Sequence, residues 1–162
     1  RLRTKNKMWV MNLYKGVVWE DNPKLLYIGM QDQYYTFNMF DAQAWYARDV
    51  IMGRIKLPSQ ADMRAHSKRW EELEGKIETP KDAWEFQANN IREILAESDY
   101  PQFDIDGVNK LLYEWKNHKK EDIMNFRDNA YRSVMTGKVS PKHHTAWMKA
   151  MDDSLEAFLA KK

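Results

Sequence analysis

A nearly continuous apolar run, Leu25-Leu26-Tyr27-Ile28-Gly29-Met30, constrains the fold of this chain more than any other feature. Such a run is typical of a strand that is covered on both faces, as in a parallel sheet. One other β-prone run, residues 13–19, precedes it across a turn at residues 20–23. The sequence therefore predicts two strands and indicates that their partner strands lie in another part of the protein.

After this run the apolar residues change to the spacing of helices. The first predicted helix ends at Gly53, is capped by Thr36 or Asn38, and presents an apolar stripe made of Phe37, Phe40, Ala44, Ala47 and Ile51. Thr79 followed by Pro80 is a strong start signal for another helix. In all, later helices are predicted over residues 59–77, 80–97, 107–120, 123–135 and 145–159, with connectors at 98–107 and 139–144.

Composition excludes several function classes. The 162 residues, 43% of them hydrophobic, suffice for one domain with its own core. The formal charge of +2 is too small for a basic field that attracts nucleic acid, and the absence of cysteine excludes disulfides, thiolate zinc sites and a cysteine nucleophile. No apolar run of about 18 residues spans a membrane, and the first residues do not form a signal peptide. The chain is therefore expected to be soluble and cytoplasmic.

Three weaker motifs do not predict a site. His143-His144 lacks the helical spacing and acidic partner of a metalloprotease. The run 104–107 begins like a calcium loop, but Trp115 stands where the bidentate glutamate belongs. The basic cluster 118–120 has acids on both sides and is typical of a solvated face. No metal site is predicted.

The most informative segment is residues 27–38, in which an apolar run passes through Gly29 into a polar, aromatic loop and then a helix. In open α/β sheets, ligands bind beyond the carboxyl ends of strands, and a helix amino terminus offers free N–H groups. The pyrimidine edge of a flavin suits such a place, with Gln33 and Thr36 as hydrogen-bonding side chains. The alternative is an ordinary connection between strand and helix, and the aromatic residues, 13% of the chain, equally suit a packed core.

Several runs in order carry a resemblance to a known family. The segments 25–33, 37–45 and 47–49 resemble the carboxy-terminal flavin-domain segment of flavin-containing monooxygenases, in particular the bacterial trimethylamine monooxygenases. The resemblance continues through 100–101, 103–107, 114–116, 126–128, 143–145 and 152–156. It covers essentially the whole chain, which makes it more specific than any single motif.

The resemblance implies an α/β fold of two FAD- and NAD(P)-binding domains, Rossmann-like, of which this chain is the mostly helical carboxy-terminal part with a few strands. Residues 1–18 would end the NADP-binding domain and return to the FAD-binding domain, 19–57 would complete the latter, and 58–162 would form a helical tail on both. Such enzymes use FAD and NADPH, and a C4a-hydroperoxyflavin oxygenates small tertiary amines, such as trimethylamine to its N-oxide, or sulfides. The family suggests a homodimer.

The resemblance also assigns residues. Gln33 and Thr36 would contact the flavin with Phe37 beside them, and Asp32 would lie near the substrate pocket or the nicotinamide. Asn6 and Trp115 would reach NADP+, with Trp115 closing the site, and Arg127 would be a cofactor-facing cation. The alternatives are a core indole for Trp115 and a surface ion pair with Asp128 for Arg127.

The glycines show what the chain lacks. Those at 16, 29, 53, 75, 107 and 137 form no GxGxxG fingerprint, so neither dinucleotide phosphate loop is present. An amino-terminal part of the same enzyme is therefore the expected partner. The alternative is an autonomous helical protein-binding module without catalysis, which would leave the run 25–30 with an exposed apolar edge.

Overall fold

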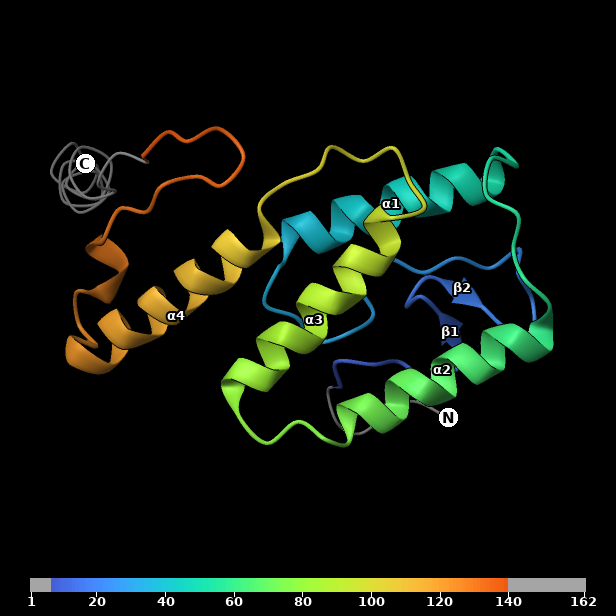
Figure 1. The fold of residues 1–162 in the computed structure, drawn as a ribbon, viewed down its shortest axis with the longest axis horizontal. Coiled ribbons are helices and arrows are strands. Elements are labelled where there is room, and N and C mark those ends of the chain that lie inside the picture. The colour runs from blue at the N-terminus through green and yellow to red at the C-terminus, as the bar shows by residue number, and fades with distance from the viewer. Residues whose placement is uncertain (1–6, 140–162) are drawn as a thin grey trace, which may run out of the picture. The chain divides into compact units, whose positions relative to one another are not determined.

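The computed structural model describes residues 7–139, which belong to two compact units, residues 1–102 and residues 103–162 (Figure 1). The elements of the first unit are β1 (Leu13–Tyr14), β2 (Val18–Trp19), α1 (Phe37–Ile51), α2 (Gln60–Glu74) and α3 (Pro80–Leu95). The second unit contains α4 (Ile105–Glu121) and the short 3-10 helix η1 (Phe126–Asp128). Within residues 7–139, no helix combines the length and apolar character needed to cross a membrane.

The strands of the first unit differ from the prediction. A hairpin forms inside the first β-prone run, where β1 pairs antiparallel with β2 and Lys15 and Gly16 turn the chain with φ of 52° and 70°. The run 25–30 contributes only an isolated bridge, Val18 to Leu26, before Gly29 turns the chain away at φ 72°. The predicted strand at 25–30 is therefore wrong for the described chain, because a single bridging residue cannot support a ladder.

The apolar run is also not buried on both faces. Leu25, Ile28 and Met30 expose 46%, 49% and 52% of their surface. Exposed large apolar side chains that lie close together usually mark a surface that another protein part covers.

Helices α1, α2 and α3 confirm the three helices predicted before residue 98. The hydroxyl of Ser59 accepts from the backbone N–H of Asp62 at the start of α2. Thr79 and Asp82 form a reciprocal capping box on α3, with Pro80 in the first turn. These ends were predictable because each cap is a local interaction.

The buried face of α1 differs from the predicted stripe. Phe37 and Ile51 are 77% and 73% exposed, and Ala47 is the only stripe residue that is buried. The buried residues of α1 are Met39, Ala42, Gln43, Tyr46, Ala47 and Asp49. This face includes two polar side chains, so a search for apolar spacing selects the wrong side of the helix.

The core of the first unit centres on α3, which packs on both α1 and α2. Trp9 stacks on Trp70 of α2 at 5.1 Å between ring centroids, and Phe86 of α3 meets Trp70 edge-on at 4.9 Å. Pairs of this geometry add about 0.5–1.5 kcal/mol to the stabilisation from burial. The aromatic residues of this region are therefore core, as the plainer sequence interpretation expected.

The second unit is only partly as predicted. The helix expected at 107–120 starts earlier, at Ile105, because the carboxylate of Asp104 accepts from the backbone N–H of Gly107 and caps it. The helix expected at 123–135 is wrong: η1 is followed by a turn that Arg132 and Val139 close through a single bridge. Asn6, His143-His144 and the helix expected at 145–159 lie outside the described residues.

Candidate cofactor site

The loop 29–36 leads into α1 and contains two of the predicted flavin-contacting residues, Gln33 and Thr36, together with Asp32. Because the loop forms neither helix nor sheet, its backbone groups need partners elsewhere. Gln43 of α1, which is fully buried, accepts from the N–H of Gly29 at 2.9 Å. Gln87 of α3 accepts from the N–H of Tyr34 at 2.7 Å. Helices α1 and α3 thus hold the loop.

Gln33 and Thr36 are two unusual residues of the loop, and Gln31, 7% exposed, shares with Gln33 a buried Oε1 that no donor among residues 7–139 bonds. The Oε1 atom of Gln33 is buried, and no donor among residues 7–139 bonds it. Thr36 takes φ 43° and ψ −111°, and its side chain does not cap α1, although it occupies the capping position as predicted. A β-branched residue at positive φ is strained, and such strain collects at ligand sites. Both residues therefore have properties that a bound ligand would explain.

The loop fits the edge of a flavin. A buried acceptor without a donor suits the N3–H of the pyrimidine ring, since buried polar atoms are otherwise bonded in native proteins. The exposed ring of Phe37 follows at the start of α1, where free backbone N–H groups favour electron-rich atoms. Asp32 is exposed on the same loop. Gln33, Thr36, Phe37 and Asp32 are thus residues that could hold the cofactor.

Two of the other predicted residues, Trp115 and Arg127, belong to the second unit. Trp115 of α4 is half-buried, meets the Phe126 ring edge-on at 5.5 Å, and has the Nζ of Lys119 at 5.3 Å from its ring. Arg127 is exposed, and its guanidinium lies 4.4 Å from the Phe126 ring centroid. Asn6 is outside the described chain, so its role stays a prediction.

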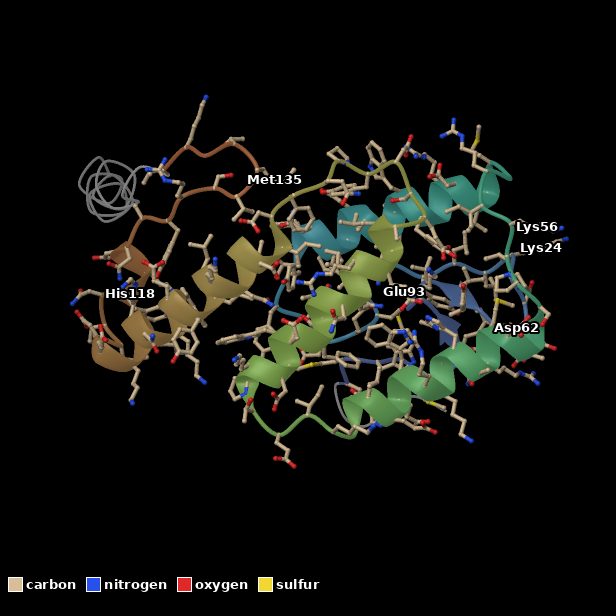
Figure 2. All side chains as sticks on the ribbon, in the orientation of Figure 1. Lys24, Lys56, Asp62, Glu93, His118 and Met135 are labelled. Carbon is tan, nitrogen blue, oxygen red and sulfur yellow. The ribbon has the colours of Figure 1, made fainter. Side chains whose placement is uncertain are left out.

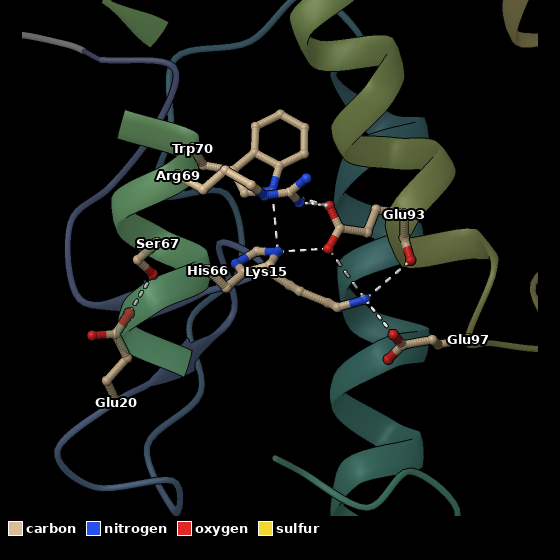
Figure 3. Close-up of polar contacts among 8 residues, drawn as sticks. All are labelled: Lys15, Glu20, His66, Ser67, Arg69, Trp70, Glu93 and Glu97. Carbon is tan, nitrogen blue, oxygen red and sulfur yellow. Dashed lines mark hydrogen bonds and ion pairs between the residues drawn. The ribbon is translucent and has the colours of Figure 1, made fainter. Parts of the chain in front are cut away.

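Sequence reasoning missed a polar cluster between the hairpin, α2 and α3 (Figure 3). Lys15 is 1% exposed, and its Nζ lies 2.6 Å from Glu97 Oε1 and 3.2 Å from the carbonyl of Glu93. The side chain of Glu93 meets His66 Nε2 at 2.6 Å and accepts from Trp70 Nε1 at 2.9 Å. Figure 2 labels Glu93 on α3.

One signal in the sequence could have revealed this cluster. Glu93 and Glu97 are four residues apart on one face of the predicted helix, where like charges repel unless a cation lies near. Burial alone would raise the pKa of Glu93, but the hydrogen bond from His66 and the charges of His66 and Lys15 outweigh it and hold that pKa below its usual value. The cluster therefore needs Glu93 ionised.

Two phenols lie against the same cluster. Burial, followed by the charges of Glu97 and Glu93, raises the pKa of Tyr14 to about 12. Burial also raises the pKa of Tyr46. The Nζ of Lys15 lies 5.5 Å from the ring centroid of Tyr46. Both phenols therefore stay neutral, and the contacts of Lys15 and His66 with Glu93 join the hairpin and α2 to α3, which makes the cluster structural.

Comparison with known proteins tests the resemblance. No family model matches the chain. The trimethylamine monooxygenase of Methylocella silvestris is 55% identical over 98% of this chain, and that of Roseovarius nubinhibens is 52% identical over 98%. The crystal structure of Tmm from a Pelagibacter strain superposes with a TM-score of 0.86 at 49% identity and 98% coverage of this chain.

These matches first indicate the class of protein to which the chain is similar. A flavin-containing monooxygenase of Aspergillus flavus is 34% identical over 56 residues, so the chain is similar to flavin-containing monooxygenases. Within that class, the resemblance to the carboxy-terminal region of the trimethylamine monooxygenases is confirmed. The chain spans about 35% of the length of the trimethylamine monooxygenases it matches. Its described residues form mostly helices with one small sheet, as the resemblance led us to expect.

Proposed function

We propose that this chain is the carboxy-terminal part of an FAD- and NADPH-dependent monooxygenase that oxygenates small tertiary amines, converting trimethylamine to trimethylamine N-oxide, and also sulfides. The observation that carries the proposal is the 55% identity, over 98% of the chain, to a protein named trimethylamine monooxygenase. Bound flavin and NADPH supply the oxygen activation, and the protein contributes binding, orientation and exclusion of water.

The loop 29–36 supports a flavin-binding role. Gln33 would accept from the pyrimidine edge through its unpartnered Oε1, and the hydroxyl of Thr36 would bond the same edge. Phe37 would flank the ring, and Asp32 would face the substrate pocket or the nicotinamide. Each of these contacts uses a side chain that is unpartnered, strained or exposed in the described chain.

The second unit would contribute to the nicotinamide side. Trp115 is half-buried, which leaves part of its indole free to close the site over NADP+. Arg127 is exposed, so its charge can reach a cofactor phosphate, and Asn6 would bind NADP+ as well. These roles rest on the family resemblance.

The partner would be the amino-terminal part of the same enzyme. It would supply both phosphate-binding loops and the remaining strands of a two-domain Rossmann-like fold, with this chain divided at residues 18 and 57. The exposed side chains of Leu25, Ile28 and Met30 support this proposal, because large apolar side chains left exposed suit a region that another protein part covers. A cytoplasmic homodimer is the proposed assembly.

The test uses the full-length enzyme that carries this chain. The purified protein should show flavin absorbance, and NADPH oxidation should accompany conversion of trimethylamine to its N-oxide. A Gln33→Leu variant should bind FAD more weakly, whereas Lys24→Ala, an exposed change outside the loop, should not. A folded, full-length protein without flavin would refute the proposal and favour the helical binding module.

A further inference from the structure

Gln87 makes contacts that single it out from the other polar residues of α3. Its side chain is 1% exposed, and both polar atoms are used. Its Oε1 accepts from the N–H of Tyr34 at 2.7 Å, and its Nε2 donates to the carbonyl of Asp32 at 2.6 Å. These two backbone groups belong to the residues immediately before and after Gln33.

We propose that Gln87 is a positioning residue, which fixes the peptide groups on both sides of Gln33 and thereby directs the Gln33 side chain towards the flavin. The inference rests on the proposed function, because it assigns a role to the same loop. Gln87 itself does not touch the cofactor in this account; it acts through Gln33.

A glutamine amide suits this task for a chemical reason. One end of the amide accepts and the other donates, which matches the N–H and the carbonyl that flank Gln33. Leucine offers neither function, and an ionised glutamate accepts only. The support is also rigid, since α3 packs on α1 and α2 and carries a capping box at its start. Rigid elements hold a binding side chain more accurately than a loop does.

The matched control lies one turn further along α3. Asn90 is 3% exposed, and its Nδ2 has no partner among residues 7–139. Asn90→Leu therefore replaces a buried amide of the same helix without removing a contact to the loop. Any loss of affinity that merely follows from disturbing α3 should appear in both variants.

The experiment measures the affinity of the full-length apoprotein for FAD together with its thermal midpoint. Gln87→Leu should weaken FAD binding about tenfold, because the loop loses two hydrogen bonds that the buried Gln87 side chain makes and that orient Gln33. Asn90→Leu should retain the affinity of the wild type for FAD, even if its thermal midpoint falls by as much as that of Gln87→Leu. Equal affinity in Gln87→Leu and wild type, or an equal loss in both variants, would overturn the inference.

A second variant decides the case if Gln87→Leu does not fold. Burial raises the pKa of a carboxyl group, so the carboxyl that Gln87→Glu introduces should regain a donor as the pH falls. The affinity of this variant for FAD, relative to that of the wild type at each pH, should therefore recover on acidification. A flat ratio contradicts the inference. A wild-type protein that binds no flavin refutes the proposed function itself, so the two failures are distinguishable.

Discussion

Helices α3 and α4 are both amphipathic, yet they differ in what they bury. Nine of the 16 residues of α3 are buried, because it packs on α1 and on α2. In α4 only Ile105 is buried among 17 residues. The comparison shows that an apolar stripe specifies where a helix can pack, whereas the neighbouring elements decide whether it does.

The difference has a consequence for the second unit. Leu111 and Leu112 are half-buried and Tyr113 is 56% exposed, so α4 retains apolar surface within the described chain. In the proposed enzyme this surface would lie against other protein parts. We therefore expect substitution of a core residue in the first unit to lower stability far more than substitution of a residue on α4.

The largest contrast is expected between two tryptophans. Trp70→Ala removes the ring that contacts both Trp9 and Phe86, and should lower the free energy of unfolding by about 3–5 kcal/mol. Trp115→Ala removes a half-buried ring that meets Phe126 edge-on, and should cost less, about 1–2 kcal/mol, while weakening NADP+ binding. Urea denaturation and NADP+ titration measure the two effects, and similar losses of stability would erase the contrast.

Two glycines provide a contrast of intermediate size. At Gly29, with φ 72°, an added Cβ would lie 2.5 Å from the Phe40 ring, so Gly29→Ala should cost about 2–4 kcal/mol. At Gly137, with φ 68°, nothing lies within 4 Å, and the backbone alone should cost about 1 kcal/mol. Thermal unfolding checks the order, and a larger loss at Gly137 would contradict the packing described around the loop.

The polar cluster predicts a dependence on pH. Because the folded-state pKa of Glu93 is depressed, its contribution is present above the usual value of 4.5 and is lost as the pH falls towards the folded-state value. Glu93 faces His66, Lys15 and Arg69, all of which favour its charged form.

Glu93→Gln should therefore show a shallower loss of stability on acidification than the wild type. Glu121, an exposed carboxylate at the end of α4 in the second unit, provides the control. Glu121→Gln should leave the acid profile nearly unchanged. The measurement is the unfolding midpoint as a function of pH, and parallel profiles for wild type and Glu93→Gln would show that the cluster is not coupled to folding.

The smallest contrast concerns helix caps. Thr79→Ala and Asp104→Ala each remove a side-chain bond to the third backbone N–H of a helix, at about 1 kcal/mol. For Thr79 the loss should reach the whole first unit, since α3 carries its core. For Asp104 the loss of stability should stay within α4, and hydrogen exchange should rise at the N–H of Gly107, which the cap bonds. If Asp104→Ala instead raised hydrogen exchange across the first unit, the prediction that the effect stays within α4 would be contradicted.

The sequence predicted what local interactions determine. The cap at Thr79 is confirmed because it uses residues within one helical turn. The strand at 25–30, the stripe on α1 and the helix at 123–135 were wrong, since each depends on which neighbours are present. A polar residue such as Gln43 on a buried face cannot be recognised from apolar spacing.

The residues of the candidate site also divide into those that the sequence predicted and those that it did not. Gln33 and Thr36 could be named from the pattern of residues 27–38 and from the family resemblance. Gln87 could not, because it meets Tyr34 across 53 positions of sequence. Lys15 was missed for the same reason, since its partner Glu97 lies 82 positions further along the chain.

The most direct measurement is a crystal structure of the full-length protein with FAD bound. The account predicts that the Oε1 atom of Gln33 lies about 3 Å from N3 of the flavin, with Gln87 still bonded to Asp32 and Tyr34. A flavin bound elsewhere, with Gln33 accepting from another protein group, would contradict the assignment of the loop 29–36 as the cofactor-binding segment.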